Sequence, residues 1–529
     1  MSTLPSDKPF ALELRGIDKR FGAVHANRNI DLQVPPGTIH GIIGENGAGK
    51  STLMNIIYGF YTADAGEIMI GGEVQNLTNS KEAIAHGIGM VHQHFMLVDN
   101  FTVLENVILG AENGALLKHS LHDARKELER LAKDYQLEVP LDALIEDLPV
   151  GLQQRVEILK ALYRGAKILI LDEPTGVLTP QETDHLFHIF DALREQGVTI
   201  LLITHKLREI LAATDNVSIM RQGAMVAHRK TAETNKEELA ELMVGRKVRL
   251  KVDKKPANPA HVVLSTQDLT YTDEMGVDRL KKVNMEIRAG EVVGIAGVSG
   301  NGQSQLINAL AGLLTPTSGL ITIGDTCISP EFPSTPDGVR QLSVGHVPED
   351  RLEMGLIKAF SAEESAILGH QNQPQYNGLV MNKPKAITEE CKRLMEEWDV
   401  RPQDPKLRSS LFSGGNQQKL IIAREVEKNP DVLLIGQPTR GVDIGAIEFI
   451  HKRIIELRDQ GQGILLVSVE LDEIMALSDR IIVMFDGHIV GEVSAEQANE
   501  KILGMMMANI MPDELKESGE EQTSSGGQS

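Results

Sequence analysis

The sequence has few cysteines, few aromatic side chains and no excess of basic residues. Its 529 residues include two cysteines, Cys327 and Cys391, and 4% aromatic residues. So few cysteines exclude a framework built from disulfides and fit a reducing compartment. The 53 basic and 74 acidic residues give a formal net charge of −21. This balance argues against a surface built to neutralise nucleic-acid phosphates.

Long apolar segments are also missing from the sequence. It contains no run of about 18 uncharged apolar residues, and residues 1–10 lack a basic segment followed by an apolar one. We therefore expect a chain that neither spans a membrane nor is exported, so that any role at a membrane is exercised through a partner. The 41% hydrophobic and 24% charged residues are ordinary for a globular protein with large cores.

The second half of the chain repeats the first. Residues 37–44 recur 253 positions later as residues 290–297, and the match continues without a gap through the following residues. Later landmarks, such as Gly151 and Gly415, recur 264 positions apart, so the second copy carries about eleven additional residues between the two blocks. A repeat of this length predicts two copies of one domain.

Composition places the boundaries of these copies. We expect a first domain at residues 10–245 and a second at 262–512. Residues 246–261 mix charge with proline, which is typical of a solvated linker, although their basic cluster could also contact anionic lipid. Residues 513–529 are rich in Glu, Ser and Gly, which predicts a disordered tail.

Within each copy, short apolar runs alternate with amphipathic segments. Residues 167–171 and 199–203 have the pattern of buried strands. The alternation predicts an α/β fold with a mixed or largely parallel sheet. Residues 104–147 have a mostly helical pattern, which indicates an inserted helical subdomain.

A phosphate-binding loop is predicted in the first copy, where residues 44–51 fit the pattern G-x-x-x-x-G-K-[ST]. The loop follows a strand-like run and precedes a helix, which is the context that the motif requires. Its backbone N–H groups can surround phosphates, Lys50 adds a positive charge, and Ser51 offers a hydroxyl to Mg²⁺. The predicted ATP-binding residues of this loop are Gly44, Glu45, Asn46, Gly47, Ala48, Gly49, Lys50, Ser51 and Thr52.

Two adjacent carboxylates end a predicted strand of the same copy, at Asp172 and Glu173. Alternation along a strand predicts that they point to opposite sides. They can then take different roles, Asp172 toward Mg²⁺ and Glu173 toward an attacking water.

These motifs resemble those of the ATP-binding cassette (ABC) ATPases, and the resemblance covers essentially the whole chain, twice. It implies that Gln93 is the glutamine that senses both Mg²⁺ and the attacking water. It also implies that His205 contacts the γ-phosphate. Phe21 matches the aromatic residue that stacks on adenine, with a plain core aromatic as the alternative.

The second copy lacks the corresponding catalytic groups. The aligned pairs are Lys50 with Gln303, Asp172 with Gly436, Glu173 with Gln437, and His205 with Val469. A cation, a metal-binding carboxylate, a general base and a histidine are thus missing from one copy. A general base contributes ~10²–10⁴ to a rate, so we expect this copy's site to be catalytically silent.

The ABC signature segment shows the reverse distribution. In the second copy it is Ser413, Gly414, Gly415 and Asn416, whereas residues 149–152 of the first copy are Pro, Val, Gly and Leu, so that only the third residue is kept. Likewise Asp443 of the second copy aligns with Thr179 of the first. In ABC dimers, which pack head to tail, ATP lies between one copy's phosphate loop and the other's signature. The resemblance therefore implies one complete hydrolytic site and one degenerate site.

Tandem cassettes with a degenerate second copy resemble the energising subunits of bacterial importers for ribose, galactosides and nucleosides. Residues 89–98 and 100–107 are most similar to the nucleoside branch. The resemblance implies integral-membrane permease subunits as partners and, through them, a solute-binding protein. It places the chain peripherally on the cytoplasmic face of the bacterial inner membrane, without direct contact to nucleic acid. Residues 95–97 could receive the permease or belong to the core.

Two other classes of protein share some of these features. Soluble tandem ABC proteins that act on ribosomes or DNA usually keep both catalytic sites and carry basic linkers. The net charge and the one-sided losses weigh against that class. A nucleotide-sensing regulator without turnover is disfavoured by the complete set of catalytic residues in the first copy.

Overall fold

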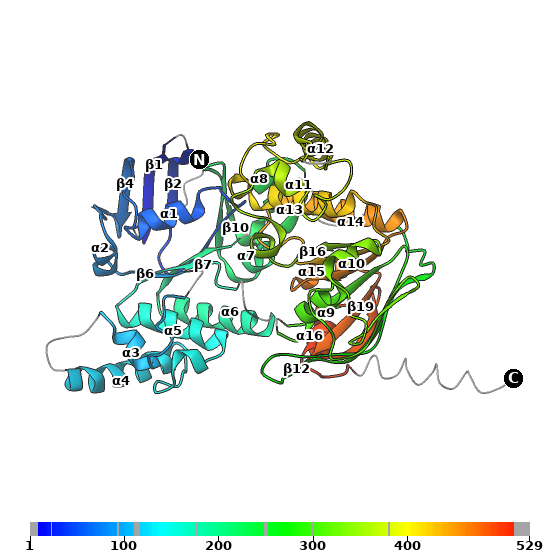
Figure 1. Ribbon diagram of the computed structural model, residues 1–529. Helices are drawn as coiled ribbons and strands as arrows, with labels where there is room; N and C mark the ends of the chain where they lie inside the picture. The colour runs from blue at the N-terminus through cyan, green and yellow to red at the C-terminus, as the bar shows by residue number, and fades with distance from the viewer. Residues whose placement is uncertain are drawn as a thin grey trace. The chain divides into compact units, whose positions relative to one another are not determined.

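A computed structural model describes residues 9–22, 24–92, 95–110, 117–175, 178, 180–204, 206–247, 252–298, 300–378 and 381–512. Its internal contacts divide the chain into two compact units, Met1–Val248 and Arg249–Ser529. Figure 1 shows both units, and each is described here by itself. The predicted tail at 513–529 lies outside the described residues, as do residues 248–251 of the predicted linker.

The first unit is built around a mostly parallel sheet with the strand order β10-β9-β3-β8-β7-β6. The strands are β3 (Ile39–Gly44), β6 (Ile88–Val91), β7 (Ile168–Asp172), β8 (Thr199–Ile203), β9 (Asn216–Arg221) and β10 (Ala224–Lys230). The neighbouring pairs are parallel except β9 with β10, which is antiparallel. Strands β3, β6 and β8 are buried along their whole length, as expected for parallel strands covered on both faces.

A second, antiparallel sheet has the order β2-β1-β4-β5. Its strands are β1 (Leu12–Phe21), β2 (Val24–Val34), β4 (Ala65–Ile70) and β5 (Glu73–Gln75). Apolar residues of both sheets meet in one core together with α1 (Lys50–Ile57), and Leu14, Ile42 and Leu53 are among its members. The sequence pattern did not predict this sheet.

Helices α3 (Val103–Ile108), α4 (Leu117–Asp134) and α5 (Val150–Tyr163) lie together, away from β1, β2 and β4 (Figure 1). Helix α3 begins at Thr102, whose side chain forms a capping box with Glu105. This group confirms the predicted helical subdomain, although residues 111–116 lie outside the described part. The remaining helices of the unit are α2 (Ser80–Ala85), α6 (Pro180–Glu195), α7 (Leu207–Ala213) and α8 (Lys236–Val244).

The second unit repeats this topology, with sheet orders β16-β17-β18-β13-β19-β20 and β12-β11-β14-β15. The strands are β11 (Val262–Thr272), β12 (Asp278–Arg288), β13 (Val292–Ala296), β14 (Ser318–Ile323), β15 (Thr326–Ile328), β16 (Val344–Val347), β17 (Val432–Gly436), β18 (Gly463–Val467), β19 (Arg480–Phe485) and β20 (His488–Ser494). The helices are α9 (Gln303–Leu310), α10 (Pro336–Gln341), α11 (Ala362–Ala366), α12 (Pro384–Glu397), α13 (Gly414–Val426), α14 (Ile444–Asp459), α15 (Leu471–Leu477) and α16 (Glu500–Met507).

Comparison of the two units locates the eleven additional residues of the second. Three precede α10, three more lie between β16 and α11, and five lie between α11 and α13. All three places are connections between elements, where insertions disturb the fold least. The α/β prediction with tandem domains is confirmed. Within the described residues, none of the helices is long and apolar enough to cross a bilayer.

Candidate functional site

The phosphate loop of the first unit joins the end of β3 to the start of α1. Gly47 and Gly49 have φ values of 80° and 99°, in the left-handed region that favours glycine. A β-carbon on Gly49 would lie 2.3 Å from the carbonyl oxygen of Ala26. Helix α1 begins at Gly49 without a side-chain cap, so its first N–H groups are available to an anion.

Lys50 lies against this loop. Its Nζ donates to the carbonyl oxygens of Gly44 at 2.7 Å and Glu45 at 3.1 Å, and the residue is 7% exposed. Burial lowers the pKa of the ammonium, while Glu173 and Asp172 act to raise it. The structure thus brings the predicted cation and both predicted carboxylates into one electrostatic cluster.

The strand alternation on which the opposite orientation of the two carboxylates was predicted ends at Asp172. Strand β7 ends at Asp172, and Glu173 leaves the extended conformation with a φ of 49° while its N–H donates to Ile203 at 2.8 Å. Alternation applies only within a strand, and here both side chains act on Lys50. Burial, together with the charge of Glu173, raises the pKa of Asp172 to about 6.

The remaining predicted residues of the first unit differ in exposure, and some lie outside the described part of the chain. Ser51 is exposed and Thr52 half-buried, both in the first turn of α1. Phe21 is 43% exposed, so it is not a core aromatic, and it packs edge-on against Tyr61 with ring centroids 5.3 Å apart. Sequence reasoning missed Tyr61, which belongs to no motif. Gln93, His205 and Thr179 lie outside the described residues.

The second unit keeps the shape of the loop and changes its charge. Gly300 and Gly302 have φ values of 92° and 100°, close to those of the first unit. A β-carbon on Gly302 would lie 2.7 Å from the carbonyl oxygen of Arg279. Gln303 stands in place of the lysine, and its amide donates to the Val298 carbonyl at 3.1 Å. The loop is therefore preserved without its cation.

The end of β17 likewise keeps its backbone geometry. Gln437 has a φ of 47°, and its N–H donates to Val467 at 2.7 Å. Its side-chain oxygen accepts a hydrogen bond from the Val469 N–H at 3.2 Å. Both units thus hold the residue after the strand in the same way, but the second presents an amide where the first presents a carboxylate.

The signature segment of the second unit begins α13. Ser413 is the exposed N-cap, and Asn416 donates to its hydroxyl at 2.8 Å. A β-carbon on Gly414 would lie 2.7 Å from the carbonyl oxygen of Gly441, and one on Gly415 would lie 2.8 Å from another side chain. In the first unit, α5 begins at Pro149, which offers no side-chain cap. The capping hydroxyl and the packed glycine at position 414 are therefore features of the second unit, whereas Gly151 of α5 is packed as closely as Gly415, with a β-carbon that would lie 2.9 Å from Glu182 Oε1.

A carboxylate that sequence reasoning missed lies beside the second unit's loop. Glu349 stands two residues after β16, as Gln93 stands two residues after β6, and it accepts a hydrogen bond from the Ser304 hydroxyl at 2.5 Å. A constant offset of 253 pairs Gln93 with His346 instead. The three residues inserted before α10 hide the true correspondence.

Of residues 95–97, Met96 is exposed, whereas Phe95 and Leu97 are half-buried. The Met96 side chain is 59% exposed, because its backbone is held to α5 by Glu157 Oε1 at 2.7 Å and Lys160 Nζ at 2.8 Å. Nearby, Phe60 is 49% exposed and stacks on His92 with ring centroids 5.7 Å apart. An exposed apolar and aromatic surface follows β6.

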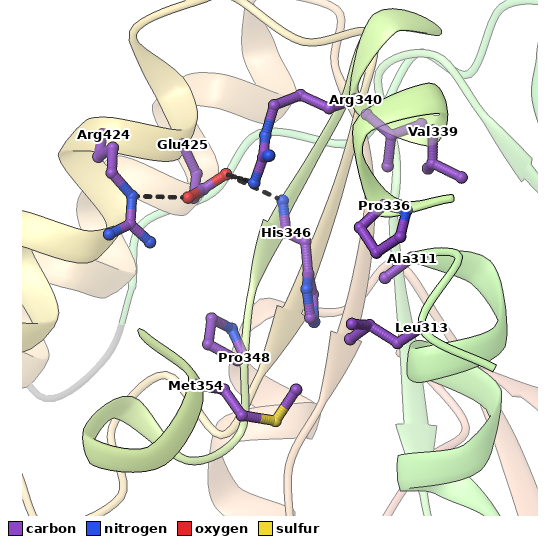
Figure 2. Close-up of a pocket in the computed structure, with 11 residues that line it drawn as sticks. Ala311, Leu313, Pro336, Val339, Arg340, His346, Pro348, Met354, Arg424 and Glu425 are labelled. Carbon is purple, nitrogen blue, oxygen red and sulfur yellow. Dashed lines mark hydrogen bonds and ion pairs between the residues drawn. The ribbon is translucent and has the colours of Figure 1, made fainter. Parts of the chain in front are cut away.

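The second unit has a cavity of about 140 Å³ beside β16 (Figure 2). Ala311 and Leu313, which line it, stand where the first unit has Tyr58 and Phe60, so smaller side chains leave this space. Its polar wall is paired in part: Glu425 accepts from the Arg424 guanidinium at 2.8 Å, whereas the buried Nε2 of His346 has no hydrogen-bond partner among the described residues (Figure 2). The remaining wall residues include Arg340, His346, Pro348 and Met354.

Comparison with known proteins identifies the family. Residues 27–176 and 280–440 match the sequence model of the family described as ABC transporter. The chain belongs to the ABC transporter family. It is accordingly an ABC ATPase, which binds ATP, and its two matched segments lie in the two units described above.

Several curated members of the ABC transporter family match along nearly their whole length. The nucleoside import ATP-binding protein of Lactococcus lactis subsp. cremoris is 46% identical over 94% of this chain and 97% of its own. The guanosine import ATP-binding protein of Bacillus subtilis is 45% identical over the same shares. A ribose import ATP-binding protein of Clostridium tetani is 35% identical over 95% of this chain and 98% of its own.

Among solved structures, an archaeal ribosome recycling factor in complex with a ribosomal stalk protein matches with a TM-score of 0.60. The matched region covers 94% of this chain and 92% of the recycling factor, at 20% identity. Similarity at this level shows the fold alone.

Proposed function

We infer that this chain hydrolyses ATP at one composite site to power an importer of nucleosides. The observation that carries the inference is the complementary loss of chemistry in the two units. The first unit clusters Lys50, Asp172 and Glu173 beside an intact phosphate loop. The second unit presents Ser413 and Asn416 at the start of α13. Only a first-unit phosphate loop that faces a second-unit signature segment would combine the lysine, the two carboxylates and the signature hydroxyl.

In this site, the residues divide the work by their chemistry. The loop amides and Lys50 bind the phosphates, while Ser51, Asp172 and Gln93 would hold Mg²⁺ through oxygen atoms, which that cation prefers. When bound, Mg²⁺ neutralises charge on the phosphates. Glu173 would accept a proton from the attacking water.

The remaining predicted residues contact other parts of the nucleotide. His205 would contact the γ-phosphate, and Phe21 would stack on adenine. Ser413, the backbone amides of Gly414 and Gly415, and Asn416 would reach the γ-phosphate from the other side.

The nucleoside assignment rests on similarity. Identity to two proteins named for nucleoside or guanosine import is 46% and 45%, against 35% to a ribose import protein. All three cover at least 94% of this chain, so the comparison extends to both units. Solute itself is recognised elsewhere in such importers, so simple sugars stand as the second candidate class.

The partners follow from the same assignment. An importer requires integral-membrane permease subunits and, through them, a solute-binding protein, which places this chain peripherally on the cytoplasmic face of the inner membrane. The exposed surface of Phe60 and Met96 in the first unit, and the cavity beside β16 in the second, are the surfaces that we assign to the permease. These two surfaces differ in chemistry, one aromatic and one partly charged.

Uptake of radiolabelled solutes tests this function. Cells lacking the gene are complemented with the wild-type chain, with Glu173→Gln, or with the matched exchange Gln437→Asn in the second unit. Labelled nucleosides and ribose are offered side by side. We expect nucleoside uptake with the wild type and with Gln437→Asn, but not with Glu173→Gln.

Other outcomes identify which part of the proposal fails. Restoration of ribose uptake alone would keep the importer and overturn the nucleoside assignment. If neither solute depends on the gene, import itself is wrong, and salt-dependent binding of the chain to ribosomes or nucleic acid would then favour the alternative class.

A further inference from the structure

The second unit places a carboxylate in the space that a metal-binding aspartate occupies in the first. Strands β16 and β17 are parallel neighbours, with Val347 opposite Ile435, so their carboxyl ends lie side by side. Glu349 follows the first of these strands, and Gly436 ends the second. A β-carbon on Gly436 would lie 2.5 Å from Glu349 Cγ and 3.0 Å from its backbone nitrogen. The glutamate side chain therefore fills the place left empty by the glycine.

This carboxylate faces the phosphate loop. Its Oε2 accepts a hydrogen bond from the hydroxyl of Ser304, which corresponds to Ser51 of the first unit. Both residues are half-buried, Ser304 in the first turn of α9 and Glu349 two residues beyond the end of β16. A serine hydroxyl and a carboxylate oxygen are the kinds of protein ligand that Mg²⁺ accepts, with phosphate oxygens and water completing its shell.

We propose that Glu349 replaces the missing aspartate as the magnesium ligand of the second unit, so that this unit binds Mg²⁺–nucleotide without hydrolysing it. The loop glycines keep the conformation that surrounds phosphates, with Gly302 at a φ of 100°. The unit still lacks the general base, because Gln437 is an amide. This inference goes beyond the proposed function, which requires only the composite site of the first unit.

The charges around the second loop make this binding depend on the cation. In the first unit, Lys50 offsets the charge of the carboxylates beside the phosphates. In the second unit, Gln303 is neutral, so Glu349 and a triphosphate would repel each other at close range. A divalent cation between them converts this repulsion into attraction. Nucleotide should therefore leave the second unit when the cation is removed, and the first unit should retain it longer.

Mn²⁺, which is paramagnetic and substitutes for Mg²⁺ on oxygen ligands, provides a direct readout. The parent is the full-length chain with Glu173→Gln, which slows turnover so that ATP itself is used. Electron paramagnetic resonance counts bound Mn²⁺ at saturating ATP. We expect the parent to bind one Mn²⁺ in each unit. Adding Glu349→Gln, which keeps the side-chain volume, should weaken the affinity for the second Mn²⁺ by about tenfold or more.

Two further variants separate a ligand role from a structural one. Glu353→Gln changes an exposed carboxylate of the same segment and should leave both Mn²⁺ ions in place. The double exchange Glu349→Ala with Gly436→Asp moves the carboxylate to the position that it has in the first unit, and it should restore the second Mn²⁺. Restoration would not occur if Glu349 merely supported the fold.

The possible failures can be told apart. If the parent binds a single Mn²⁺, and adding Asp172→Asn removes it, the inference is overturned and the proposed function stays intact. Two Mn²⁺ ions that both survive Glu349→Gln would also overturn it. A parent that binds no Mn²⁺ with ATP would overturn both this inference and the proposed function.

Discussion

Exchange of one functional group between the two units gives the sharpest test of the composite site. Glu173 and Gln437 occupy the same backbone geometry, with φ values of 49° and 47° and an N–H bonded to the neighbouring strand. A glutamate at 437 could still accept the Val469 N–H through its carboxylate. The exchanges Glu173→Gln and Gln437→Glu are therefore close to isosteric and should leave both units folded.

The expected magnitudes follow from what surrounds each position. Loss of the general base should lower ATPase activity by about 10²–10⁴, which corresponds to roughly 3–5 kcal/mol in the barrier. Gln437→Glu should change activity by less than about twofold, because a base alone gains little without the cation missing at Gln303. The double variant should be as inactive as Glu173→Gln.

Phosphate release by the full-length chain, assembled with its membrane subunits at saturating MgATP, measures these effects. Binding of a fluorescent ATP analogue to the first unit serves as the folding control and should be unchanged in Glu173→Gln. Recovery of a substantial part of wild-type activity in the double variant would refute the argument, since it would show that the second unit lacks nothing but its base.

Other consequences of the structure can be measured separately. Gly49→Ala should abolish ATP binding to the first unit, because its β-carbon would lie 2.3 Å from a backbone oxygen. Gly47→Ala, whose β-carbon would have no atom within 4 Å, should weaken ATP binding less. A titration with a fluorescent ATP analogue measures both. Ser413→Ala removes the cap of α13, so it should destabilise that helix by about 1 kcal/mol and lower ATPase activity while ATP affinity of the first unit stays unchanged. Arg458→Met removes a guanidinium that is 1% exposed and paired with two aspartates; because Asp459 is partly exposed and Asp479 keeps Lys254, we expect the loss to lower the unfolding free energy of the second unit by about 1.5–3 kcal/mol in thermal unfolding. Burial opposes ionisation of Glu425, but the charges of Arg424 and Arg340 outweigh it and lower the pKa of this carboxyl in the folded state. The ionised carboxylate therefore stabilises the fold above the unfolded-state pKa of about 4.5, and this stabilisation is lost as pH falls through the lower folded-state pKa. Glu425→Gln should make the unfolding free energy less sensitive to acid in that range.

The sequence predicted much of the fold because its signals are local. The parallel strands are short apolar runs, and the phosphate loop has a fixed spacing, so both could be located without any three-dimensional information. The antiparallel sheet of β1, β2, β4 and β5 was not predicted: β1 and β2 are consecutive in the chain, but the pairing of β1 with β4 joins segments far apart in the sequence and leaves no local pattern.

The site was predicted less completely, for physical reasons that differ between residues. The opposite orientation expected for Asp172 and Glu173 loses its basis, because Glu173 is a left-handed residue beyond the end of the strand. Glu349 was missed because an insertion in a loop shifts the correspondence by three positions. The roles of Gln93 and His205 remain predictions, since both lie outside the described residues.

The division of chemistry between the units restricts which pairings can hydrolyse ATP. Two first units facing each other would place Pro149, which has no N–H, opposite each intact loop. Two second units would offer both signatures but no cation at Gln303 and no base at Gln437. A single chain contains one copy of each half, so it carries both sets of groups that the proposed composite site requires. In this proposal each unit lacks groups that the other carries, so turnover depends on the chain as a whole rather than on either unit alone.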